Sequence, residues 1–291
     1  MSEKGDTTKE DGWESGPNPV RQIIVTRTAQ VGGAAGLALA GLGTVLPASQ
    51  TIPLAIGGGV GVTLGLSAYF VATFYARTPF GGSLWVRLPR QAGNVVALTF
   101  DDGPHPNTTP RLLDLLAQAN VQATFFLVGE RARAYPDLAR RVAEAGHTIG
   151  VHGLRHRTMV LQNARQIACD LREAARILED TTGKPLAARL LRPPYGFKTW
   201  TLGRVARREG WTIASWSLDG RDYDPQTPAQ LAERISARLA VRDIVLLHER
   251  PGDSVTLDAL PAILTDCQTR AFACVGLAAV AGAAIMPESL S

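Results

Sequence analysis

A short apolar run that ends in two carboxylates is the feature that most constrains this chain. Residues 95–100 read Val-Val-Ala-Leu-Thr-Phe, and Asp101, Asp102, Gly103 and Pro104 follow. The run is typical of a buried β-strand, which Gly103 and Pro104 end. Ligands of α/β folds bind at the carboxyl ends of strands, so Asp101 and Asp102 lie where a site is expected. One could hold a metal while the other accepts a proton; a plain Asp-Gly turn is the alternative.

From about residue 94 onward, further apolar runs alternate with helical patterns. This alternation predicts βα units and therefore a parallel sheet or barrel. We expect strands at residues 123–128, 147–151, 211–216 and 243–247, helices around 112–116, 136–145 and 161–180, and a last strand and helix within 272–286.

Residues 28–76 contain no Asp, Glu, Lys, Arg or His, a run of 49 residues that follows a polar tail, residues 1–27, which we expect to be disordered. Its second half, 52–75, is long enough to cross a hydrocarbon layer of roughly 30 Å. The Gly- and Ala-rich first half, 31–46, suits close helix packing in lipid. We therefore expect one or two transmembrane helices and a cell-membrane protein that contacts lipid through residues 28–76. A Gly-rich soluble linker is the alternative.

The number of helices would decide the side of the membrane on which the remainder lies. Basic residues flank the uncharged run at both ends. Because positive flanks stay in the cytoplasm, a helical hairpin would leave the C-terminal domain inside, whereas a single span at 52–75 would place it outside. Both arrangements fit the flanking charges.

The overall charge excludes one class of partner. The chain has a net charge of +4, and none of its basic residues form a run with interleaved aromatic residues. We therefore expect no nucleic-acid binding. Three cysteines, Cys169, Cys267 and Cys274, lack CxxC spacing and are expected to be buried thiols.

A histidine pair follows the strand predicted at 147–151. His152 and His156 are four residues apart, so a helix or a tight turn would place both imidazoles on one face, where they can share a metal. With a carboxylate such as Asp102 they form a set of two histidines and one carboxylate. Such a set leaves coordination positions open for water and substrate, as a catalytic metal site requires.

Three other polar stretches follow predicted strands or turns. His248 ends the run at 244–248, and an imidazole there can protonate a leaving amine near neutral pH. Arg192 precedes two prolines, so its charge can orient a nearby carboxylate and favour its ionised form. The rigid turn that follows can present a backbone N–H to an oxyanion. Asp219 and Asp222 form a further acidic pair after the strand at 211–216. Each stretch alone would also fit an ordinary structural role.

Taken in order, these stretches resemble the five motifs of the polysaccharide deacetylase family, the NodB-homology carbohydrate esterases. The resemblance covers about residues 94–277. Two positions depart from the usual motifs: Gly153 stands where the family has a hydroxyl residue, and Tyr223 where it often has Trp. The motifs are residues 99–104, 152–156, 192–196, 219–223 and 246–248.

The resemblance implies roles for the first three motifs. Asp101 is expected to be the catalytic base, and Arg192 to brace it. Asp102, His152 and His156 are expected to be the metal ligands, with Zn²⁺ as the default ion.

The remaining implied roles concern the leaving group and the substrate. His248 is expected to be the catalytic acid, with Asp222 tuning it. The backbone N–H of Tyr195 would support the oxyanion, Leu246 would line the acetyl pocket, and Tyr223 would form one wall of the groove.

By the same resemblance, residues 94–291 are expected to form a deformed (β/α) barrel of about seven strands in the α/β class. The barrel would follow the transmembrane segment and a connector, residues 77–93. The implied activity is metal-dependent hydrolysis of N-acetyl groups from a glycan such as peptidoglycan, a chitin-like oligomer or an exopolysaccharide. Because known family substrates lie mostly outside the cell, an extracytoplasmic domain is favoured. A small-amide hydrolase and a non-catalytic, membrane-tethered glycan-binding protein are the alternatives.

Overall fold

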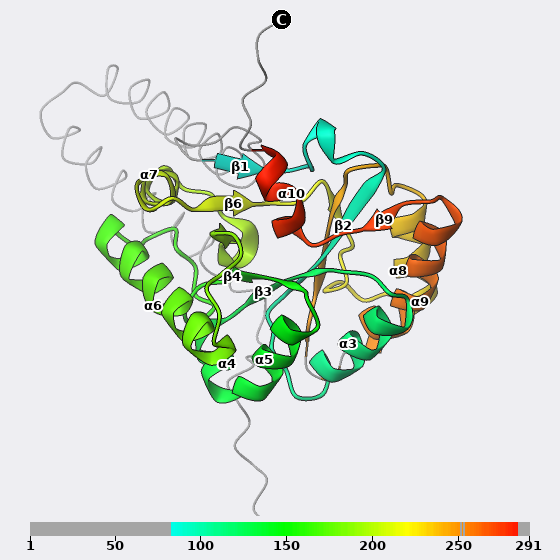
Figure 1. Cartoon of the computed structure of the whole chain (residues 1–291), viewed down its shortest axis with the longest axis horizontal. Helices are drawn as coiled ribbons and strands as arrows, with labels where there is room; N and C mark the ends of the chain where they lie inside the picture. Colours follow the sequence, from blue (N-terminus) through cyan, green and yellow to red (C-terminus); the bar gives the residue numbers. More distant parts are fainter. Residues whose placement is uncertain (1–82, 251, 253, 285–291) are drawn as a thin grey trace, which may run out of the picture. The chain divides into compact units, whose positions relative to one another are not determined.

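The computed structural model describes residues 83–284, apart from residues 251 and 253. Nine parallel strands form a curled sheet in the order β1-β6-β5-β4-β3-β2-β8-β7, and β9 pairs with the start of β2 (Figure 1). No pairing joins β7 to β1 in this part of the chain, so the sheet is an open barrel. The strands are β1 (Ser83–Trp85), β2 (Val95–Asp101), β3 (Thr124–Leu127), β4 (Thr148–Val151), β5 (Leu190–Leu191), β6 (Thr212–Ala214), β7 (Leu218–Asp219), β8 (Ile244–His248) and β9 (Ala273–Cys274).

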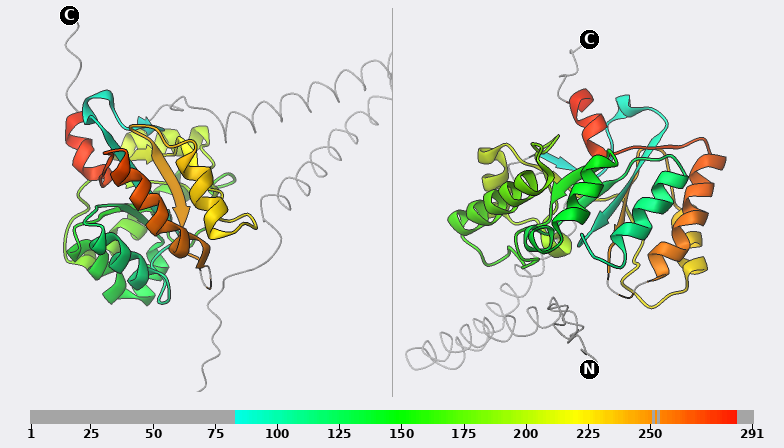
Figure 2. Two further views of the ribbon diagram at one scale, coloured as in Figure 1. Left: turned by 90° about the vertical axis from the view of Figure 1, so that its right-hand side faces the viewer. Right: turned by 60° about the horizontal axis from the view of Figure 1, so that its bottom comes forward.

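Most helices surround the outer face of the curled sheet, and α10 lies across one end (Figure 2). Two helices, α6 and α8, begin with a capping box, at Asn163 and Thr227, in which side chains accept hydrogen bonds from backbone N–H groups of the first turn. The helices are η1 (Arg90–Ala92), α3 (Thr109–Gln118), α4 (Gly129–Ala134), α5 (Pro136–Glu144), α6 (Ala164–Thr182), η2 (Pro194–Gly196), α7 (Trp200–Glu209), α8 (Pro228–Ser236), α9 (Ser254–Thr269) and α10 (Leu277–Ala284).

One hydrophobic cluster lies on the outer face of the sheet and a second lies on its inner face, because successive side chains of a strand point to opposite faces. Leu98 and Phe100 of β2 belong to the outer cluster, beneath the helices. Ala97 belongs to the inner cluster, together with Ile244 and with Leu277 of α10. The inner cluster fills the barrel near the amino ends of β2 and β8. The interior near their carboxyl ends is therefore left to polar side chains.

The predicted elements agree well with the structure, and the α/β barrel class is confirmed. The strands that we expected at 123–128, 147–151, 211–216 and 243–247 correspond to β3, β4, β6 and β8. The last strand and helix that we expected within 272–286 correspond to β9 and α10. The sheet has nine strands rather than about seven, and the strands that were not predicted are β1 and the two-residue segments β5 and β7. The connector expected at 77–93 also differs: its described part forms β1, which pairs with β6, and η1.

The predicted membrane segment, residues 28–76, and the polar tail, 1–27, lie outside the described residues. Among the helices of the described residues, none combines the length and the apolar character that a membrane span requires.

Candidate active site

Strand register brings the first and last motifs together. In the parallel pair β2 and β8, Thr99 lies opposite Leu246 and Asp101 lies opposite His248. These four positions alternate with the outer-cluster residues, so they face the barrel interior. Leu246 is buried, and it belongs to neither hydrophobic cluster. The motif residues thus converge at the carboxyl ends of neighbouring strands, as the sequence predicted.

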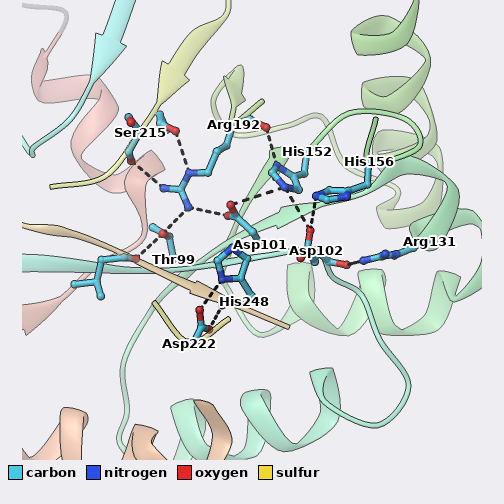
Figure 3. A network of polar contacts seen from close by, with 12 residues as sticks. Thr99, Asp101, Asp102, Arg131, His152, His156, Arg192, Ser215, Asp222 and His248 are labelled. Atoms are coloured by element: carbon cyan, nitrogen blue, oxygen red, sulfur yellow. Dashed lines mark hydrogen bonds and ion pairs between the residues drawn. The ribbon is translucent and has the colours of Figure 1, made fainter. Parts of the chain in front are cut away.

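A fully buried arginine supports Asp101. Arg192 follows β5, and its guanidinium donates to Asp101 Oδ1 at 2.7 Å and to the Thr99 hydroxyl at 2.8 Å. It also donates to the carbonyl oxygens of Ala214 and Ser215 at 3.0 and 2.9 Å. A buried charge is tolerated only when it is paired and hydrogen-bonded, and Arg192 meets both conditions. Asp101 is therefore held in one orientation by a fixed charge (Figure 3).

Asp102, His152 and His156 form a cluster whose ligand atoms all lie within 4.8 Å of one another. Asp102 Oδ1 is 2.9 Å from His156 Nε2 and 3.5 Å from His152 Nε2. His152 Nδ1 lies 2.7 Å from the carbonyl oxygen of Arg192, which accepts the Nδ1–H hydrogen bond, so Nε2 is the ring nitrogen that faces Asp102. The structure thus brings together the three predicted ligands.

The surroundings of Asp102 fit a bound cation. Its Oδ1 is buried, and apart from the two histidine Nε2 atoms it has no polar partner among the described residues. Burial alone would raise the pKa of Asp102, but His156 and His152 outweigh it and hold the pKa well below its ordinary value. An ionised carboxylate beside two imidazoles is a donor set that suits a divalent transition metal, Zn²⁺ above all.

His248 lies on the other side of Asp101 and is paired with Asp222. The two atoms His248 Nδ1 and Asp222 Oδ1 are 2.7 Å apart, and Asp222 Oδ2 accepts hydrogen bonds from the His248 backbone N–H and the Thr256 hydroxyl. Burial would lower the pKa of His248, but Asp222 outweighs it and raises the pKa to about 10. His248 is therefore protonated at neutral pH, with Nε2 available to donate that proton.

Two tyrosines border this constellation. Tyr195 has a left-handed backbone (φ 62°), and its ring centroid lies 4.8 Å from that of His156. Tyr223 is 45% exposed, makes an edge contact with the His248 ring at 5.6 Å, and donates its hydroxyl to Asp219. Both therefore lie beside the side chains that would meet a substrate.

The two histidine ligands lie on a turn and not on a helix. Gly153 has a left-handed backbone (φ 77°), which glycine adopts without steric cost. The turn is tied down from two sides: the Gly153 carbonyl accepts from the Gly129 N–H of α4, and Asp170 Oδ1 of α6 accepts from the Leu154 N–H at 2.9 Å. These bonds hold the turn although the hydroxyl residue usual in the family is absent.

Several residues of the site were not predicted. Glu249 is buried behind Asp101: its N–H donates to the Asp101 carbonyl, and its carboxylate accepts the Thr109 hydroxyl. Arg131 of α4 donates to the Asp102 carbonyl. Glu249 directly follows His248, so position in the sequence could have indicated it. Arg131 lies in a helix with no motif, and nothing in the sequence marks it.

Several residues outside the site have ordinary structural roles. His147 Nδ1 accepts from the Ala123 N–H, and burial lowers the pKa of His147 to about 4. Cys267 and Cys274 are buried as predicted. Cys169 is exposed on α6, so that part of the cysteine prediction was wrong.

Comparison with known proteins identifies relatives of this chain. The sequence pattern of the polysaccharide deacetylase family matches residues 89–236. A peptidoglycan-N-acetylglucosamine deacetylase of Bacillus cereus is 33% identical over 60% of this chain and 64% of its own length. A chitooligosaccharide deacetylase of Azorhizobium caulinodans is 31% identical over 61% of this chain and 90% of its own. The crystal structure of the Bc1960 peptidoglycan N-acetylglucosamine deacetylase superposes with a TM-score of 0.66, at 31% identity over 70% of this chain and 96% of that one.

Proposed function

Because the chain belongs to the polysaccharide deacetylase family, we propose that it removes N-acetyl groups from a glycan by hydrolysis, releasing acetate. The observation that carries this proposal is the placement of two opposed proton-transfer groups around one cluster of ligands. Asp101, braced by Arg192, lies 3.8 Å from His152 Nε2, and the paired strand end carries His248. Amide hydrolysis needs such a base and such an acid on either side of the scissile bond.

We assign the metal site to Asp102, His152 and His156. A divalent cation bound there, most simply Zn²⁺, would polarise the acetyl carbonyl and lower the pKa of a water molecule by Lewis-acid chemistry. Protein groups carry out the proton transfers and stabilise the oxyanion.

Asp101 accepts a proton from the attacking water, and Arg192 keeps the carboxylate oriented during this transfer. Water oxygen then bonds to the acetyl carbon, and the carbonyl oxygen takes up the negative charge. The left-handed turn at Tyr195 offers its backbone N–H to that oxygen. His248 donates its Nε2 proton to the amide nitrogen as the C–N bond breaks, which leaves acetate and a free amine.

The substrate side of the proposal rests on two further residues and on the relatives. Leu246 is an apolar side chain in the polar part of the barrel interior, and it suits the acetyl methyl group. The exposed Tyr223 ring beside His248 suits one wall of a sugar groove. Relatives named for N-acetylglucosamine in peptidoglycan and for chitooligosaccharide point to a polymer of N-acetylglucosamine. Residues 28–76 would anchor the protein to the cell membrane, with the catalytic domain outside.

The decisive experiment measures acetate released by the full-length protein in detergent. Substrates are N-acetylglucosamine oligomers, peptidoglycan and acetamide-type small amides, each with EDTA and after Zn²⁺ is restored. We expect release from a glycan that EDTA stops and Zn²⁺ restores. Release of acetate from small amides alone would indicate a small-amide hydrolase and not a glycan deacetylase. No release from any substrate, and no retained metal, would indicate a glycan-binding protein.

A further inference from the structure

The edge of the sheet opposite the active site carries a set of basic side chains. All strands are parallel, so the loops that enter them lie at one edge, and the motif residues lie at the other. None of these basic side chains forms an ion pair with a described residue. We call them the basic face: Arg90 before β2, Lys184 and Arg189 before β5, Arg207 in the last turn of α7, and Arg238 and Arg242 before β8.

The acidic groups of this edge do not offset the basic face. Glu209 is bound by Arg172 and Arg208, and Asp243 is buried against Arg87 at 2.7 Å. These carboxylates therefore neutralise other arginines. Glu144, at the end of α5, and Glu179, in the last turn of α6, are exceptions: neither forms an ion pair with a described residue, although Glu179 accepts a hydrogen bond from the Leu186 N–H. The edge keeps a clear positive excess, which an anionic surface would complement.

The chain also enters the domain at this edge. Because β1 is parallel to β6 and Ser83 lies opposite Thr212, the start of β1 belongs to the same edge as the basic face. The uncharged run ends at residue 76, seven residues earlier in the sequence. Seven extended residues reach at most about 25 Å. If residues 52–75 cross a bilayer, this edge must lie close to its headgroups.

We propose that the basic face lies against the anionic headgroups of the bilayer in which residues 52–75 are anchored. The carboxyl ends of the strands, with Asp101 and His248, then point away from the lipid and toward a glycan outside it. Each basic side chain near an anionic leaflet raises the ratio of docked to undocked protein roughly fivefold. Removal of three should therefore lower this ratio about a hundredfold. High salt should have the same direction of effect.

The test places a fluorophore at each edge of the full-length protein in vesicles. Cys169→Ser removes the exposed thiol, and the buried Cys267 and Cys274 are left unchanged. A bimane is attached at Gln91→Cys in η1, beside the basic face, or at Leu161→Cys in the exposed loop after β4. Vesicles contain phosphatidylcholine alone or with phosphatidylglycerol, and a lipid spin-labelled on its headgroup is the quencher.

We expect the label at position 91 to be quenched in phosphatidylglycerol vesicles and the label at position 161 to remain bright. Arg207→Gln, Arg238→Gln and Arg242→Gln together, or added salt, should release the quenching at 91. The matched control, Arg157→Gln, Arg165→Gln and Arg250→Gln at the opposite edge, should leave it unchanged.

Three outcomes would overturn the proposal. They are equal quenching at both positions, quenching at 91 that does not depend on lipid charge or on the three arginines, and failure of the protein to co-float with vesicles. All three leave the proposed deacetylase activity untouched, because the three arginines of the basic face lie at the edge of the sheet opposite Asp101 and His248.

Discussion

Asp101 and Asp102 are adjacent in sequence but have different partners. Asp101 continues β2, points into the barrel and is held by Arg192. Asp102 has a left-handed backbone (φ 75°), which turns its side chain toward His152 and His156. The change of backbone conformation at one residue separates the proposed base from the proposed metal ligand.

We therefore expect Asp101→Asn to lose turnover by at least the 10²–10⁴-fold that a general base contributes, while the metal content stays at the wild-type level. Acetate release and zinc analysis on the same sample measure both properties. Asp102→Asn is the matched control and should lose metal together with activity. If Asp101→Asn lost the metal and Asp102→Asn kept it, the two assignments would be reversed.

The pairing of His248 with Asp222 predicts a pH effect. An acid must be protonated, so activity falls as pH rises past the His248 pKa, which is raised to about 10. Asp222→Asn removes the charge that raises this pKa and keeps an oxygen for the Nδ1 hydrogen bond. We expect the alkaline limb of kcat/KM to move to lower pH, as a pH–rate profile would show.

His248→Ala serves as the reference for that profile. It should lower the rate about 10²–10⁴-fold and abolish the limb. An alkaline limb at the same pH in wild type and Asp222→Asn would mean that a different group acts as the acid.

At the residue scale, the sequence predicted which side chains converge at the carboxyl ends of the strands better than it predicted their hydrogen-bond partners. The motifs were sufficient to find Asp101, His152 and His248. They could not show that Arg192 donates to Thr99 and to the Ser215 carbonyl, because these bonds depend on the register of strands far apart in sequence. The position of Glu249 next to His248 could have indicated it, but its hydrogen bonds to Asp101 and Thr109 could not be predicted from the sequence.

The turn that carries His152 and His156 is the element on which the proposed metal site depends most. It packs between α4 and α6, and a Cβ atom at Gly153 would lie in ordinary van der Waals contact, 3.4 Å from Asp170 Oδ1 and from Pro194 Cγ. The hydrogen bond from the Leu154 N–H to Asp170 fixes the distance of the turn from α6.

Asp170→Ala should loosen this turn. It leaves the Leu154 N–H without its acceptor, which costs about 1–3 kcal/mol of stability, and it should weaken zinc binding. Urea denaturation and zinc titration measure the two effects. Asp170→Asn keeps an acceptor oxygen and should restore most of both. Asp180→Ala, an exposed ion-pair partner on the same helix, is the control, and equal effects of the two alanine variants would argue against this role of Asp170.

At the element scale, the long patterns were predicted and the very short strands were not. Helices α5 and α6 show clear 3.6-residue periodicity, and β3 and β8 are continuous apolar runs. Two-residue strands such as β5 and β7 carry no periodicity, so only the fold reveals them. This is why β5 and β7 were absent from the strands predicted from apolar runs.

At the scale of the whole molecule, Glu249 links separate parts of the barrel. Its N–H donates to β2, its carboxylate accepts from Thr109 of α3, and it belongs to the chain that leaves β8. Its Oε1 has no hydrogen-bond partner among the described residues. Burial raises the pKa of Glu249 to about 8, from an ordinary value of 4.5. The folded protein therefore holds this proton more tightly than the unfolded chain does.

This difference predicts how global stability depends on pH. Between pH 4.5 and about 8 the unfolded chain has released the Glu249 proton and the folded protein retains it. The free energy of unfolding should therefore fall as pH rises, by roughly 1.4 kcal/mol per pH unit from this group. Glu249→Gln cannot ionise, so its stability relative to wild type should rise steadily across that window and level off above it.

Urea denaturation of both proteins in EDTA and the same detergent at pH 5, 6, 7 and 8 measures the difference, with the exposed Glu144→Gln as the control. A constant difference between wild type and Glu249→Gln would mean that Glu249 is ionised in the folded protein throughout, with its charge balanced by Arg131.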